Sequence, residues 1–210
     1  MQEFLKDTEI IDWTHPAVLA KAKQLTSGTT STQQTAQRCF EWVRDEIQHS
    51  IDFRCNPVTC SASEVLRSGT GFCYAKSHLL AALLRANNIP TGFVYQRLSG
   101  ERVPYTLHGL NAIHLPNFGW YRADARGNKP GVNAQFNPPV EQLAFLPADP
   151  EEKLFPEILS DPLNVVVAAL RKYPDWELLW NNLPDWPDAS LSGAEIATPH
   201  KYAINVHGSR

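Results

Sequence analysis

The stretch Gly69-Thr-Gly-Phe-Cys73-Tyr-Ala-Lys-Ser-His-Leu-Leu-Ala-Ala-Leu-Leu-Arg85-Ala-Asn-Asn-Ile-Pro90 decides the fold. Small residues at its start predict a tight turn that ends at Cys73. Residues 74–87 then carry apolar side chains at helical spacing, and 79–84 are apolar nearly all round. Such a helix belongs in the centre of a molecule, with every face buried. Asn87-Asn88 ends it, and Ile89-Pro90 begins an extended segment.

Extended segments follow this helix, and shorter helices precede it. Strands are predicted over 91–98, 106–115 and 119–124, and Pro116-Asn-Phe-Gly119 is a plausible hairpin turn between the last two. Upstream, helices are predicted over 14–26, 32–45 and 62–66, with Thr14 and Thr32 as the N-caps of the first two.

Cys73 is the candidate nucleophile, because it follows two glycines and opens the central helix. The partial positive charge at a helix N-terminus favours the thiolate, which is the reactive form of a cysteine. A tight glycine turn also exposes the sulfur and frees a backbone N–H for an oxyanion. The alternative is that Cys73 is a small buried apolar residue, as most free cysteines are.

A nucleophilic cysteine needs a base and a group that orients the base. A hairpin centred on Pro116 places His108 opposite Asp124, whereas one centred on Gly119 places His114 opposite Asp124. The predicted turn lies between these two centres, so both histidines remain candidates.

These two blocks of residues resemble the transglutaminase-like superfamily of papain-like cysteine enzymes. The first block is the Gly-x-Cys helix that runs on to Leu-Leu-Arg-Ala and Ile-Pro. In the second block of the family a His begins a strand, Gly-Trp follows about a dozen residues later, and an Asp comes four after the Trp. The same spacing joins His108, Trp120 and Asp124 in this sequence, which favours His108 over His114 as the base. The resemblance covers about residues 34–128.

The resemblance implies an α+β fold with a papain-like core, in which the cysteine begins a central helix packed on an antiparallel sheet. It implies a catalytic triad in which Cys73 attacks an acyl carbon, His108 holds the ion pair and Asp124 orients the imidazole. It calls for no cofactor and no metal. The resemblance does not assign the second oxyanion donor. Gln48 and His49 are the candidates, because they lie upstream of the cysteine.

The chain departs from the family pattern at several positions. Leu110 and Ala112 replace an aromatic and an acidic residue after the histidine, Ala125-Arg126 replaces a Pro-Thr pair, and Asn88 replaces a glycine. These changes leave the triad intact and predict an unusual substrate groove.

Composition excludes several classes of partner. The 210 residues carry 19 Lys and Arg against 22 Asp and Glu, a net charge of −3, which offers neither the positive surplus of a nucleic-acid binder nor a polybasic membrane anchor. No apolar run approaches the roughly 20 residues of a membrane helix. Four sparse cysteines, and an N-terminus without the basic and apolar regions of a secretory signal, lead us to expect a cytoplasmic protein.

We expect a single domain over 1–210, with its core at about 34–128 and an extension, 129–210, packed on that core. A helix is predicted over 161–173, capped by Asp161 with Pro162 at its first position. Trp176, Trp180 and Trp186 are expected to dock the extension on the core, with a place along the acyl groove as the alternative. Residues 191–210 read as a loosely held tail.

The leading hypothesis is a cysteine hydrolase or acyltransferase that acts on an amide, in a peptide or a small molecule. Hydrolysis ranks above cross-linking, because the chain lacks extra domains and an acidic cluster typical of a calcium site. The alternatives are an amine acyltransferase of the transglutaminase type and a catalytically silent interaction module on the same fold. A further alternative is a zinc-stabilised domain, with the ligands Cys55, Cys60, Cys73 and His78.

Overall fold

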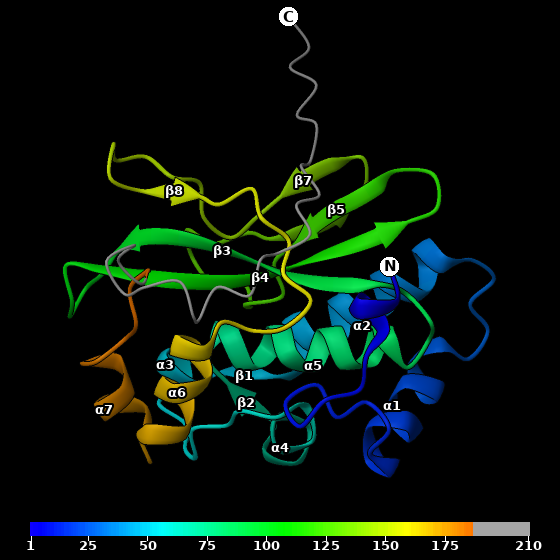
Figure 1. The fold of residues 1–210 in the computed structure, drawn as a ribbon, viewed down its shortest axis with the longest axis horizontal. Helices are drawn as coiled ribbons and strands as arrows, with labels where there is room; N and C mark the ends of the chain where they lie inside the picture. Colours follow the sequence, from blue (N-terminus) through cyan, green and yellow to red (C-terminus); the bar gives the residue numbers. More distant parts are fainter. Residues whose placement is uncertain (187–210) are drawn as a thin grey trace, which may run out of the picture.

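A computed structural model describes residues 1–186 and shows helices packed on one face of an antiparallel sheet (Figure 1). The expected α+β class is therefore confirmed. The helices are η1 (Gln2–Leu5), α1 (Pro16–Thr26), α2 (Thr32–Glu46), α3 (Ser50–Phe53), α4 (Ala62–Ser68), α5 (Cys73–Arg85), α6 (Asn164–Lys172) and α7 (Trp176–Trp180). The main sheet has the order β5-β4-β3-β8, from β3 (Thr91–Ser99), β4 (Tyr105–Leu115), β5 (Gly119–Ala123) and β8 (Lys153–Leu154). Two small sheets pair β1 (Gln48–His49) with β2 (Thr70–Gly71), and β6 (Gln135–Asn137) with β7 (Val140–Gln142).

Helix α5 is the centre of the molecule, because all 13 of its residues are buried. It lies along β3 and β4 on one side and against α1, α2 and α4 on the other. After its last turn, Asn88 adopts a φ of +57°, a left-handed conformation that Asn tolerates better than most residues. This conformation explains why a glycine suits the same position in the family pattern.

The β4–β5 hairpin follows neither of the two registers considered from the sequence. Leu115 pairs with Gly119, His114 with Trp120 and Asn111 with Ala123, so the turn is centred on Asn117. Extending this register places Asp124 opposite Leu110. Because residues two apart point to the same face of a strand, His108 lies diagonally from Asp124.

Two predicted N-caps are wrong by one residue. His15 caps α1 by accepting a hydrogen bond from the Ala17 N–H, while Thr14 is bound to Asp7 instead. Ser31 caps α2, which leaves Thr32 as its first helical residue. In both cases the cap is the residue whose backbone is still extended or turned where the helix begins.

The start predicted for the helix after residue 160 is also wrong, because α6 begins at Asn164. Asp161 caps nothing and accepts a hydrogen bond from the Ser160 hydroxyl. The Leu163 N–H donates to the Tyr95 hydroxyl of β3. A contact with the sheet therefore sets the beginning of α6, and no local signal reports it.

The part of the extension that the structure describes, residues 129–186, runs over both sides of the core. Its β6–β7 hairpin lies beside β5, β8 adds to the edge of β3, α7 packs against α3, and Arg171 of α6 binds Glu64 of α4. The loosely held tail predicted for 191–210 lies outside the described residues.

Gly92 on β3 marks the tightest contact between core and extension. A Cβ at Gly92 would lie 2.6 Å from Ile158 Cγ2 and 2.8 Å from the Leu159 carbonyl oxygen. We expect Gly92→Ala to lower the free energy of unfolding by about 1–3 kcal/mol, the usual cost of overpacking. Chemical denaturation measures this, and adding Ile158→Ala should recover part of the loss. An unchanged stability in the single variant would show that this contact is looser than the structure has it.

Within residues 1–186, no helix has the length and apolar character needed to cross a bilayer.

Candidate active site

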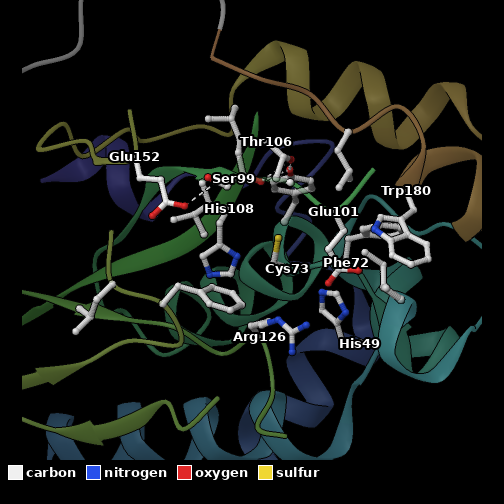
Figure 2. Close-up of a pocket in the computed structure, with 18 residues that line it drawn as sticks. His49, Phe72, Cys73, Ser99, Glu101, Thr106, His108, Arg126, Glu152 and Trp180 are labelled. Atoms are coloured by element: carbon white, nitrogen blue, oxygen red, sulfur yellow. Dashed lines mark hydrogen bonds between the residues drawn. The ribbon is translucent and has the colours of Figure 1, made fainter. Parts of the chain in front are cut away.

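A pocket of about 270 Å³ opens at the N-terminus of α5, where the helical layer meets the sheet (Figure 2). Cys73 is the first residue of α5, His108 lies on β4, and His49 lies on β1. The other residues that line it are Ile51, Phe72, Tyr74, Leu98, Ser99, Gly100, Glu101, Thr106, Leu107, Arg126, Phe145, Leu146, Glu152, Trp180 and Leu183.

His108 and Asp124 form a buried hydrogen-bonded pair. The distance from His108 Nε2 to Asp124 Oδ2 is 2.7 Å, and the two side chains are 6% and 0% exposed. Asp124 also accepts from the backbone N–H groups of Arg126 and Ala144. Burial raises the pKa of Asp124, but the charge of His108 and these hydrogen bonds outweigh it and hold the pKa below its ordinary value. The carboxylate is therefore ionised.

The second nitrogen of the His108 ring is left for Cys73, which lies close enough to act on the pKa of the imidazole. Figure 2 shows the imidazole beside the sulfur at the bottom of the pocket. Burial lowers the pKa of His108, but the negative charges of Asp124 and Cys73 and the hydrogen bond to Asp124 overcome it and raise the pKa to about 10. An imidazolium held in this way stabilises an adjacent thiolate.

Cys73 differs in surroundings from the other thiols. Desolvation raises the pKa of Cys39 to about 12, and burial raises that of Cys60 to about 11, so both are protonated, unreactive thiols. Cys73 is instead the first residue of α5, and its backbone N–H has no acceptor within residues 1–186. It is the cysteine that combines a helix N-terminus with a charged histidine.

His114, the competing base, lies away from the pocket. It is six residues further along β4, about 20 Å at the rise of a strand. Its ring packs edge-on against Trp120, 5.3 Å between centroids, and Trp120 packs against Phe4. Both residues therefore anchor the hairpin, as expected for Trp120.

Comparison with known proteins identifies the family of this chain. The sequence profile of the transglutaminase-like superfamily matches residues 19–125. The chain belongs to the transglutaminase-like superfamily. This confirms the resemblance to the family, and no match was found among curated proteins.

Solved structures similar to this transglutaminase-like chain come from bacteria. A candidate cysteine protease from Cytophaga hutchinsonii is 18% identical to this chain, with a TM-score of 0.48. The match covers 59% of this chain and 40% of the length of the protease chain. The periplasmic domain of TgpA from Pseudomonas aeruginosa is 22% identical to this chain, with a TM-score of 0.45. The match covers 58% of this chain and 45% of the length of the TgpA chain. The chain thus covers less than half the length of either protein.

Of the two upstream residues considered as oxyanion donors, only His49 lines the pocket of this transglutaminase-like chain. Gln48 is exposed and accepts a hydrogen bond from the Cys55 thiol. His49 is 5% exposed, and its Nδ1 lies 3.7 Å from Asp52 without a hydrogen bond. Burial, followed by the charge of Arg126, lowers the pKa of His49 well below its ordinary value. The ring is therefore a neutral imidazole directed at the pocket (Figure 2).

Arg126 is the site residue whose role the sequence did not reveal, because it stood out only as a departure from the family pattern. Its guanidinium makes a two-pronged ion pair with Asp52 of α3, at 2.7 and 3.0 Å, and Lys129 binds the same carboxylate at 2.7 Å. Burial raises the pKa of Asp52, but these partners lower it to about 2. The pair joins the helical layer to the loop after Asp124 and so holds the two sides of the pocket together.

The four proposed zinc ligands do not meet in this structure. Cys55 binds Gln48, and His78 Nδ1 contacts the Cys60 carbonyl within the core. Across residues 1–186, no three His, Cys, Asp or Glu side chains gather as a metal site. The arrangement required by the zinc alternative is therefore not present in the described part of the chain.

Proposed function

We propose that the protein is a cysteine hydrolase or acyltransferase that breaks an amide bond through Cys73, His108 and Asp124, with a peptide or a small amide as substrate. The observation that carries this proposal is the placement of His108, which is hydrogen-bonded to the buried Asp124 and lies beside Cys73 in the pocket (Figure 2). Such a chain of nucleophile, base and orienting group is what acyl transfer requires.

The first half of the reaction uses the thiolate–imidazolium pair. The Cys73 sulfur attacks the carbonyl carbon, the C–S bond forms, and the carbonyl oxygen takes the negative charge. His108 then gives its proton to the departing nitrogen as the C–N bond breaks, which leaves a thioester on Cys73 and releases an amine. Asp124 keeps the ring in position and stabilises its charged form.

The second half reverses the proton transfer. His108, now neutral, takes a proton from a water molecule, whose oxygen attacks the thioester, and the C–S bond breaks to release an acid and restore the pair. An amine in place of water would make the same step a transfer. We propose hydrolysis as the main reaction, with transfer to an amine as the alternative.

Two donors are available for the oxyanion. One is the Cys73 backbone N–H at the start of α5. We assign the other to His49, because its neutral ring lines the pocket and its Nδ1 is buried without a hydrogen-bond partner within residues 1–186.

The proposal is tested by alkylation with iodoacetamide between pH 4 and pH 9, with peptide mapping of all four cysteines. Cys73 should react fastest, and it should still react well below pH 8.5, where an ordinary thiol is mostly protonated. His108→Ala should remove this advantage, while His114→Ala, the matched control, should keep it. A Cys73 that reacts no faster than Cys55 would refute the activated pair and favour a silent module.

A further inference from the structure

Part of the pocket wall comes from residues that the family profile does not reach. The profile ends at residue 125, yet Phe145, Leu146, Trp180 and Leu183 all line the same pocket as Cys73. All four side chains are apolar and come from the extension. The extension therefore supplies an apolar wall to the site, defined here as these four residues.

The apolar wall is fastened to the strand that carries the proposed base. The Pro184 carbonyl accepts a hydrogen bond of 2.8 Å from the N–H of Leu107, the residue before His108. Asp185 pairs with Arg97 of β3 through two contacts of 2.8 Å. Trp186 stacks on Phe155 with 3.7 Å between ring centroids. These contacts fix the position of Leu183 relative to the reacting atoms.

Trp180 and Leu146 complete the wall from two other directions. The Arg102 guanidinium lies 4.4 Å from the centre of the Trp180 ring, which ties α7 to the loop between β3 and β4. Leu146 is 77% exposed at the edge of the pocket, although a leucine gains free energy when it is covered. A bound apolar group would cover it.

The charges around the pocket disfavour an anion. Arg126 is paired with Asp52, whose carboxylate Lys129 also binds, and the carboxylate of Glu152 is held by the N–H groups of Ser99 and Ala148. Glu101 also lines the pocket and has no ion pair within residues 1–186. Apart from the thiolate–imidazolium pair, the uncompensated charge of the lining is therefore negative.

We propose that the apolar wall binds an aromatic or branched aliphatic side chain of the substrate, on the residue whose carbonyl Cys73 attacks. This inference rests on the proposed function and names its substrate class. Phe72, Ile51 and Leu98 line the same pocket, so such a side chain would be enclosed by apolar groups. An acidic side chain there would be desolvated without a cationic partner.

The test compares reactive probes that alkylate a thiolate. Three N-acetyl aminoacyl chloromethyl ketones, with phenylalanine, leucine or aspartate side chains, are reacted with the full chain, and the rate of labelling of Cys73 is followed by mass spectrometry. We expect the phenylalanine and leucine probes to react at least 10-fold faster than the aspartate probe. A single methylene group in a hydrophobic pocket already discriminates by about 10- to 200-fold.

Variants of the wall separate binding from reactivity. Trp180→Ala and Leu183→Ser should each lower the ratio of the phenylalanine-probe rate to the iodoacetamide rate about 10-fold, because iodoacetamide is too small to need the wall. Leu178→Ala is the matched control, because this leucine lies on α7, is 46% exposed and does not line the pocket. Trp180 and Leu183 are both partly exposed, so we expect both variants to fold. Either variant alone is enough for the test if the other fails to fold.

Two kinds of failure can be told apart. Equal rates for all three probes, with normal labelling by iodoacetamide, would overturn the substrate class and leave the proposed function standing. A Cys73 inert to iodoacetamide would overturn the proposed function, and the substrate class with it.

Discussion

Cys73→Ala is expected to abolish turnover of amide substrates, with a loss of about 10⁶-fold, since removal of a nucleophile from a triad costs about this much. No other group in the pocket can form the thioester on which the proposed reaction depends. Cys73→Ser should be nearly as inactive, because a serine hydroxyl beside an imidazolium is not deprotonated as a thiol is. The measurement is hydrolysis of phenylalanyl and leucyl peptide amides, with mass spectrometry to detect an acyl group on the enzyme.

Cys55→Ala is the control for this experiment. Cys55 is partly exposed and its thiol binds Gln48, outside the pocket, so activity and acylation should remain those of the unchanged protein. Turnover that survives in Cys73→Ala would mean that another residue carries the chemistry, and it would contradict the proposed function directly.

Asp124→Ala is expected to lower the free energy of unfolding by about 3–5 kcal/mol, because it leaves a buried charged partner without its counter-ion. Asp124 is fully buried and accepts three hydrogen bonds, from His108, Arg126 and Ala144. For a chain of this size the loss corresponds to a fall of roughly 10 °C in Tm. Asp161→Ala, which removes an exposed carboxylate bound only to Ser160, should change the stability by less than about 0.5 kcal/mol.

The pH dependence of stability tests whether the charged His108–Asp124 pair is the cause of this loss. The folded-state pKa of His108 is raised from 6.5 to about 10, so its contribution to stability is complete below pH 6.5 and is lost as the pH rises to about 10. Lys76 has the opposite effect, because burial lowers its pKa to about 7, and stability gained from its deprotonation grows above that pH. The difference between the unchanged protein and Asp124→Ala removes the part of the Lys76 contribution that does not depend on the charge of Asp124.

This difference in unfolding free energy should therefore shrink between pH 6.5 and pH 10, with a slope of at most about 1.4 kcal/mol per pH unit for one proton. Urea denaturation at pH 6, 8 and 9.5 measures it. A difference that stays constant over this range would show that Asp124 acts through its backbone hydrogen bonds and not through the charge of His108.

Local patterns were enough to predict α5 and the strands, and the resemblance to the family selected His108 over His114. The apolar run of residues 79–84 requires a buried helix wherever it is placed, and the glycines before Cys73 predict a turn at its start. The alternation of β3 and β4 likewise depends on neighbours in the chain. Cys73, His108 and Asp124 stood out because each one begins or follows such an element.

The N-caps, the start of α6 and the hairpin register were decided by tertiary contacts. Asp161 and Pro162 form a good local start signal, but the bond from Leu163 to Tyr95, 68 residues away, begins the helix later. The hairpin turn allowed several registers, and packing of the sheet on α5 selected one that places His108 diagonally from Asp124.

The sequence by itself determined the central helix, its cysteine and the strands around it, because each depends on spacing between near neighbours. Only the tertiary structure decided which groups surround that cysteine. The Arg126–Asp52 pair joins residues 74 apart, and Trp180 and Leu183 reach the pocket from the extension, over a hundred residues after Cys73. No local pattern carries such partners, since they are brought together by burial of apolar surface across the whole chain and by the pairing of buried charges.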